Sequence, residues 1–275
     1  MRKKLILILA ITAILWTCVP VSASLDSGLV GYWKFDEGSG NAVIDETMTG
    51  NNGTVYGAAW VDGISGKALK FDGVGDYVDV PDATDLNPTS AITVTAWFNI
   101  SSFKYGQYSW PSIVNKWGEG AITQSNEATS APYGYRLGID QVWENNPSLL
   151  FGAYLEGDGW STTDSVPVEE DTWYFVAGVY DGSAFTLYVG QDGRPLDLTL
   201  PVSHSGNIIT SSNNLNIGGA PSVYGDRSVN GLVDEVRIYD RALSENDIAE
   251  LYITIPEPAS LLLLSLGGLV LRKRC

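Results

Sequence analysis

The fold class is decided by one stretch of the chain, Trp173-Tyr174-Phe175-Val176-Ala177-Gly178-Val179-Tyr180-Asp181-Gly182, and by the run Phe185-Thr186-Leu187-Tyr188-Val189 that follows it. Both runs are rich in β-branched and aromatic residues, which favour strands. The Asp-Gly pair between them indicates a hairpin, because glycine supplies the positive φ that a tight turn needs. The stretch therefore predicts two antiparallel strands joined by a short turn.

Similar runs recur on both sides of this hairpin, separated by Gly, Asp and Asn. They lie at residues 31–35, 68–71, 77–80, 92–100, 135–139, 149–154, 215–218 and 231–239. Helical periodicity is nearly absent before Ser244, where Ser-Glu-Asn-Asp indicates an N-cap and an acidic first turn for a short helix that ends at Tyr252. The pattern predicts an antiparallel β sandwich with short turns and a terminal helix.

The N-terminus has the order of a secretory signal peptide. A basic group, Arg2-Lys3-Lys4, precedes an apolar run at 5–19, and small residues follow at 21–23. We expect residues 1–23 to be removed by signal peptidase during export. A lipoprotein site at Cys18 is the alternative, but the bulky Trp16 two residues earlier fits it poorly.

The C-terminus combines three segments: Pro256-Glu257-Pro258, an apolar stretch at 259–271, and Arg272-Lys273-Arg274. Thirteen apolar residues are fewer than the roughly 20 that span a bilayer, although flanking basic side chains extend their reach. A plain tail anchor and a core helix are the alternatives. The segment 256–275 closely resembles the PEP-CTERM sorting signal of Gram-negative bacteria. That resemblance implies membrane contact through a hydrophobic helix, cleavage near the Pro-Glu-Pro motif by an exosortase-type protease, and a cell-surface or extracellular location.

Loss of both ends changes the chemistry of what remains. Cys18 and Cys275 lie in the removed segments, so residues 24–255 hold no thiol. Six of the basic residues and one acidic residue are also lost, which leaves ten basic and 31 acidic residues and a net charge of −21. Such a surface repels nucleic acid and anionic lipid. No Pro- or Ser-rich linker divides residues 24–255, so we predict one domain; calcium or solubility alone explains its acidity.

Four blocks in this span match, in order, a known family. They are Gly31-Tyr32-Trp33-Lys34-Phe35-Asp36-Glu37-Gly38-Ser39-Gly40, residues 66–73, residues 173–182 and residues 231–244. The chain from about Gly28 to Tyr252 resembles the LamG-like jelly-roll domains of the concanavalin A-like class. The resemblance implies an all-β, antiparallel two-sheet jelly-roll sandwich. It says less about function, because one fold hosts many sites.

Calcium is the metal that the resemblance implies, since relatives of this fold often hold a stabilising ion between the first and last strand segments. The first candidates are Asp36, after the first predicted strand, and Asp234, in the last strand block. Asp226 and Asn230 are a second pair in a loop that resembles the pentraxin-like calcium loop, although the acidic triplet expected there is missing. For Asp234 the competing interpretation is a charge pair with a basic neighbour such as Arg237.

Aromatic residues are the candidate ligand contacts. Trp33, Trp97 and Trp173 fall within predicted strands and are expected in the core. Other aromatic residues occur in Gly-, Asn- and Ser-rich stretches, where rings can stack on sugar C–H faces while amides and carboxylates meet hydroxyls; these are Tyr105, Tyr108, Trp110, Trp117, Trp143 and Trp160. The alternative is that these rings pack a long insertion onto the sandwich.

Catalytic residues are not predicted. Retaining glucanases of this fold need two carboxyls about 5–5.5 Å apart, and no Glu-x-Asp-x-(x)-Glu run exists here. Glu156-Gly157-Asp158 is only loosely similar, and its glycine indicates a loop. His204, the only histidine, lies between two serines, without a Gly-x-Ser-x-Gly elbow, which favours a surface loop over a triad. One histidine without cysteine also argues against zinc.

The sequence thus predicts an exported, non-catalytic protein of the cell surface or extracellular matrix of a Gram-negative-type bacterium. Its LamG-like domain is expected to bind carbohydrate or to adhere, with a polysaccharide or a surface protein as partner and no nucleic acid. A structural surface or biofilm component without a defined ligand is the alternative. A divergent glycoside hydrolase is the third interpretation.

Overall fold

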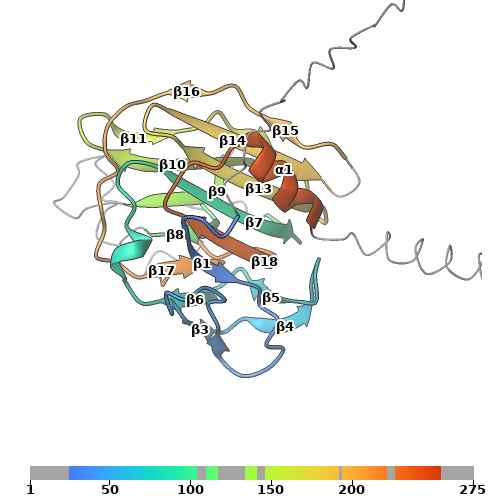
Figure 1. The fold of residues 1–275 in the computed structure, drawn as a ribbon. Coiled ribbons are helices and arrows are strands. Elements are labelled where there is room, and N and C mark those ends of the chain that lie inside the picture. Colours follow the sequence, from blue (N-terminus) through green and yellow to red (C-terminus); the bar gives the residue numbers. More distant parts are fainter. Residues whose placement is uncertain are drawn as a thin grey trace, which may run out of the picture.

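Two antiparallel β-sheets, stacked one in front of the other, form the protein (Figure 1). The computed structural model describes residues 25–103, 110–116, 134–140, 146–191, 194–221 and 227–254. The predicted all-β, two-sheet sandwich is confirmed. The expected signal segment and the C-terminal apolar helix lie outside the described residues.

Sheet A has the strand order β15-β14-β13-β7-β18-β5-β4, with β1 also paired to β18 and β16 to β14. Its strands are β1 (Leu29–Trp33), β4 (Ala59–Asp62), β5 (Lys67–Asp72), β7 (Ile92–Ile100), β13 (Trp173–Tyr180), β14 (Ala184–Gln191), β15 (Asp197–Leu198), β16 (Val202–Ser203) and β18 (Asn230–Tyr239).

Sheet B has the order β11-β10-β9-β8-β17-β6-β3-β2, with β12 also paired to β10. Its strands are β2 (Ala42–Val43), β3 (Gly53–Tyr56), β6 (Tyr77–Val80), β8 (Ser112–Asn115), β9 (Tyr135–Asp140), β10 (Ser148–Leu155), β11 (Gly159–Thr162), β12 (Val166–Pro167) and β17 (Leu215–Ile217). A short 3₁₀ helix, η1 (Thr84–Leu86), precedes β7, and the helix α1 (Glu245–Thr254) follows β18.

Strand β13 is buried on both faces, which explains its unbroken apolar sequence. Tyr174 and Val176 belong to the main core between the sheets. Phe175 and Ala177 point the other way and pack with Ile248 of α1, which lies across the front of β13 in Figure 1. The helix therefore covers the outer face of sheet A. On the outer face of sheet B, Asn115, Arg136 and Asn216 are also buried, and exposure increases toward β3 and β6.

The predicted hairpin of β13 and β14 is confirmed, with Tyr180 opposite Phe185. Asp181 organises the turn, because its Oδ1 accepts hydrogen bonds from the backbone N–H groups of Ser183 and Ala184, both at 2.8 Å. Gly182 has a φ of 93°, as the turn requires.

The predicted helix start is also confirmed. The Ser244 Oγ accepts a hydrogen bond from the Asp247 N–H at 3.2 Å, and the Asp247 Oδ2 accepts one from the Ser244 N–H at 3.1 Å. This reciprocal pair is a capping box. The helix ends at Thr254, where Pro256 disfavours helical geometry for the residue before it. Among the described helices, none is long and apolar enough to cross a membrane.

Close packing between the sheets depends on one small residue. A Cβ at Gly178 of β13 would lie 2.2 Å from the Cγ of Phe151 on β10, in the other sheet. We expect Gly178→Ala to lower the free energy of unfolding by about 1–3 kcal/mol, because overpacking forces the sheets apart. Urea denaturation measures this loss.

Phe151→Leu provides the matched control. In the Gly178→Ala background we expect the double variant to lose less stability than the two single losses added together, because the shared clash is relieved. Additive losses would contradict this packing account.

Candidate functional site

A continuous row of residues crosses the outer face of sheet B. Each member lies opposite the next in the strand register; the row is Thr162, Gly152, Arg136, Asn115, Asn216, Asp79, Thr54 and Ala42. Most members are polar, whereas the alternate residues on the same strands face the core. This alternation is what period-two geometry produces when one face of a sheet stays out of the core.

The middle of the row is buried and firmly held. The Nη1 of Arg136 lies 2.8 Å from the Oδ1 of Asp140, and its Nε donates to the Oγ of Ser112 at 3.0 Å. The Asp79 carboxylate accepts hydrogen bonds from the side-chain amides of Asn214 and Asn216, at 2.9 and 3.0 Å. These contacts fix the polar groups in place before any ligand arrives.

Aromatic pairs flank the row near both ends of sheet B. Tyr56 and Tyr77 stack across β3 and β6, with ring centroids 4.8 Å apart and an angle of 17°. Tyr56 is 46% exposed. Tyr154 and Trp160 form a tilted pair on β10 and β11, with centroids 5.6 Å apart. The outer face therefore offers aromatic rings beside half-exposed Asp79, Thr54 and Thr162.

Of the six aromatic residues predicted from the sequence to contact a ligand, the structure describes two. Trp160 lies on the outer face of sheet B, and Trp110 lies beside β8 with the Arg227 guanidinium 6.0 Å from its ring centroid. Tyr105, Tyr108, Trp117 and Trp143 lie outside the described residues. Tyr56 and Tyr77 are candidates that sequence reasoning missed, and the alternation in Thr54-Val55-Tyr56 and Tyr77-Val78-Asp79 is the pattern that indicates their shared face.

Asp36 and Asp234, the first metal candidates, converge on one turn. The loop of residues 63–66 joins β4 to β5. The Oδ2 of Asp234 accepts hydrogen bonds from the N–H groups of Ile64 and Ser65, at 3.0 and 3.2 Å. The Oδ1 of Asp36 accepts one from the Lys67 N–H at 2.8 Å. Two carboxylates from distant segments thus meet at a single hairpin.

Asp234 is a buried carboxyl without a cation among the described residues. Its pKa is raised to about 8, mainly by burial and also by the negative charges of Glu235 and Asp36, against hydrogen bonds from the backbone that lower it. Its Oδ1 is buried and has no hydrogen-bond partner in the described part of the chain. The expected rival pairing with Arg237 is wrong, because the Arg237 Nη2 contacts the Glu235 Oε2 at 2.7 Å instead.

These observations fit a hard cation. An unpartnered carboxylate oxygen and a second nearby carboxylate are ligands that calcium accepts, together with backbone carbonyls. Of the second pair, Asp226 lies outside the described residues, and the Asn230 side-chain amide donates to the Oγ of Ser102 at 2.7 Å. In the described ranges no group of three or more His, Cys, Asp or Glu side chains is arranged to hold a metal.

Glu156 and Asp158 lie in the turn between β10 and β11, which agrees with the predicted loop. The Asp158 Oδ2 lies 2.7 Å from the His204 Nδ1, a pairing that the sequence did not predict. The Glu156 Oε2 accepts a hydrogen bond from the Asn207 side-chain amide at 3.1 Å. Glu156, Asp158 and His204 line, together with serines, an open polar hollow of about 440 Å³. Each carboxylate is engaged by a neighbouring loop, which favours a structural role for the pair.

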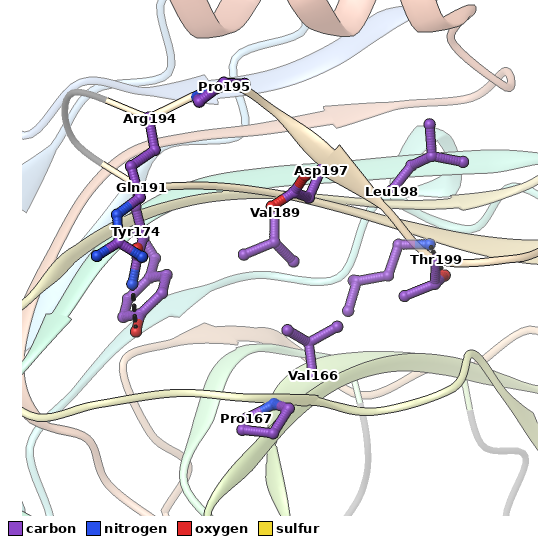
Figure 2. Close-up of a pocket in the computed structure, with 11 residues that line it drawn as sticks. Val166, Pro167, Tyr174, Val189, Gln191, Arg194, Pro195, Asp197, Leu198 and Thr199 are labelled. Atoms are coloured by element: carbon purple, nitrogen blue, oxygen red, sulfur yellow. Dashed lines mark hydrogen bonds between the residues drawn. The ribbon is translucent and has the colours of Figure 1, made fainter.

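A second hollow lies between the sheets at the edge formed by β12 and β15, and has a volume of about 230 Å³ (Figure 2). Val166 and Pro167 form one wall, and Val189 and Leu198 lie opposite them. On one side the Tyr174 hydroxyl accepts a hydrogen bond from the Gln191 amide at 2.9 Å. The hollow is thus a largely apolar cleft with a polar rim.

Family comparison agrees with this architecture. The family model described as the concanavalin A-like lectin/glucanases superfamily, Laminin_G_3, matches residues 72–249, which is more than half of the chain. The chain therefore belongs to this family, and the LamG-like resemblance is confirmed. The comparison with curated proteins found no match.

Solved structures share the fold at low sequence identity. Domain 4 of AbnA, a GH43 extracellular arabinanase from Geobacillus stearothermophilus, in complex with arabinotriose, has 18% identity and a TM-score of 0.58 over 82% of this chain and 98% of that one. The botulinum neurotoxin DC binding domain is similar in its complex with SialylT (13% identity, TM-score 0.57) and in its complex with rat synaptotagmin II (13%, 0.58). Each of these two matches covers 85% of this chain and 53% of the toxin chain.

The raised pKa of Asp234 predicts a pH dependence of stability in calcium-free buffer. The folded-state pKa of about 8 lies above the ordinary value near 3.9, so folding favours the protonated form. Its contribution is fully present below about pH 4 and is lost as the pH rises toward 8. We expect Asp234→Asn to remove this downward slope, measured by urea denaturation in chelator from pH 5 to 8. Parallel profiles for the two proteins would contradict the burial of an unpaired carboxyl.

Proposed function

We propose that this protein is a non-catalytic carbohydrate-binding domain whose ligand surface is the outer face of sheet B. The observation that carries the proposal is the stacked pair of exposed Tyr56 and partly buried Tyr77 beside Asp79 and Thr54 on that face. Trp160 with Tyr154 supplies a second aromatic position toward the opposite edge of the sheet.

The chemistry of this surface suits a saccharide. Aromatic rings have apolar faces that match the C–H faces of a sugar, while fixed carboxylate, hydroxyl and amide groups meet its hydroxyls. Asp79 is already oriented by Asn214 and Asn216, so binding costs little ordering of the polar groups. With its net charge of −16, the chain favours a neutral or cationic glycan over a polyanionic one.

Two findings from similar structures support a binding role. Domain 4 of AbnA was solved with arabinotriose, and the neurotoxin binding domain with SialylT. The proposal remains non-catalytic because Asp158 and Glu156, the loosely glucanase-like pair, are bound to His204 and Asn207 at a turn. A protein partner at the cell surface is the other binding candidate, favoured by the synaptotagmin complex of the same toxin domain.

The sequences at both ends of the chain support a location outside the cell. Residues 1–23 have the pattern of a secretory signal, and Pro256-Glu257-Pro258 with the apolar and basic residues behind it resembles a PEP-CTERM signal. We propose export, sorting by an exosortase-type protease and display on the surface of a Gram-negative-type bacterium. At that location a polysaccharide of the extracellular matrix is the ligand that we propose.

Calcium is part of the proposal as a structural ion. Asp36 and Asp234 would hold it at the turn of residues 63–66. When bound, the ion would balance both carboxylates and release the proton from Asp234. This would tie the segment after β1 and the long strand β18 to the β4–β5 hairpin.

Removal of the exposed tyrosine tests the ligand surface. We expect Tyr56→Ala to weaken binding at least tenfold to the oligosaccharides that the unmodified protein binds on a glycan array, because the exposed stacking surface is lost. Trp160→Ala should weaken this binding by a smaller factor. Glycan-array screening followed by titration calorimetry measures both effects.

Tyr188→Ala is the matched control, since Tyr188 lies on β14 and packs against the cluster on the outer face of sheet A. It should bind like the unmodified protein. Equal losses in all three variants, or an empty array with the protein folded, would contradict the proposed site.

Addition of calcium tests the ion. We expect calcium to raise the melting temperature of chelator-treated protein by several degrees at pH 7, because an ion that binds only the folded protein stabilises it. Asp234→Asn should abolish this increase, whereas Asp226→Asn should retain it. An unchanged melting temperature of the chelator-treated protein would refute the calcium proposal.

A further inference from the structure

The cleft of Figure 2 is an opening in the main core. Its lining includes Tyr174, Leu187 and Val189, which belong to the core between the sheets, and Val166, which packs against that core. The strands that border it, β12 and β15, have two residues each. Pro167 of β12 also lacks an N–H group with which to extend the sheet. The hydrophobic core of the sandwich is therefore open along the edge formed by β12 and β15.

Helix α1 ends at the rim of this cleft. The Tyr252 hydroxyl donates to the backbone carbonyl oxygen of Arg194 at 2.7 Å and also contacts that of Gln191. Both Gln191 and Arg194 line the cleft. Two residues after Tyr252 the helix ends, so the chain leaves α1 beside the opening.

The sequence that follows α1 matches the cleft in polarity, and its acidic residue can pair with the basic residue of a lining that also contains Asp197. Leu261-Leu262-Leu263-Leu264 is apolar, as are the walls. Arg194 is the only basic residue among the described residues that line the cleft, and Glu257 is the only acidic residue between 255 and 275. An apolar cavity of roughly 150 Å³ holds a benzene molecule, so the cleft of about 230 Å³ has room for one or two leucine side chains.

We propose that this cleft is a docking site for the leucine run at 261–264 of the same chain, with Glu257 near Arg194. Leu261 lies seven positions after Thr254, a reach of up to roughly 23 Å at 3.3 Å per residue. Docking would shield one or two of these leucine side chains from water before the tail meets a membrane, and removal of the tail would reopen the cleft. This role is independent of sugar binding, which lies on the outer face of sheet B.

Disulfide cross-linking in the full chain tests the docking. In a background with Cys18→Ser and Cys275→Ser, one protein carries Leu198→Cys with Leu262→Cys, and a control carries Met48→Cys with Leu262→Cys. Leu198 lines the cleft and is 49% exposed, while Met48 is fully exposed beyond β2, at the opposite end of sheet B. Both substitutions are therefore at surface positions that tolerate change.

We expect oxidation at high dilution to join residues 198 and 262 within one chain at least ten times faster than 48 and 262, as read by peptide mass spectrometry. Equal rates for the two pairs would overturn the proposal. A disulfide at 198 that forms only between two chains would also overturn it, because the occupant would then be a second copy.

Discussion

The buried carboxyl of Asp234 is the constraint on which much of sheet A depends. It lies in β18, the strand that pairs with β1, β5 and β7. Its hydrogen bonds to Ile64 and Ser65 attach this strand to the β4–β5 hairpin. The register with β7 shifts between Asp234 and Arg237, and Glu235 adopts a φ of 53°. This bulge turns Glu235 toward Arg237 and leaves Asp234 without a basic partner in the described chain.

A bulge of this kind has an energetic consequence. A positive φ at a non-glycine residue is costly and persists only where the surrounding structure demands it. Here the Glu235 carboxylate gains both the Arg237 guanidinium and the Tyr32 hydroxyl, and that guanidinium also lies 3.8 Å from the Tyr32 ring centroid. The arrangement separates two adjacent acids into different roles: Glu235 is neutralised by protein, and Asp234 is available to a cation.

Sequence patterns predicted the long strands and the helix but not the short strands or the site. The run at 173–180 and the cap at Ser244 are local signals, and both appear as strand and helix in the structure. Strands such as β2, β11 and β12 have two to four residues and form only because a longer neighbour pairs with them. The pair of Tyr56 and Tyr77 depends on strand register, which alternation within each segment does not give. Arg237 was placed correctly in the last strand, but the bulge reversed which acid it contacts.

The two outer faces of the sandwich differ: α1 packs on that of sheet A, whereas that of sheet B carries a polar row that is buried in its middle and partly exposed toward both ends. The helix packs on Phe175 and Trp97 of sheet A, where it ends beside the open edge of the core. Sheet B keeps its polar row, with members drawn from residues 42 to 162 and residue 216. No continuous segment contains this surface, so it exists only in the folded protein. Its aromatic pairs and fixed carboxylate are the features of the described residues on which we base the proposed sugar site.

The most direct test is a crystal structure of the calcium-loaded protein soaked with an oligosaccharide selected on a glycan array. This account predicts a sugar ring against Tyr56 and Tyr77, with a hydroxyl hydrogen-bonded to Asp79. A sugar found instead in the hollow lined by Glu156, Asp158 and His204, with the outer face of sheet B empty, would contradict it.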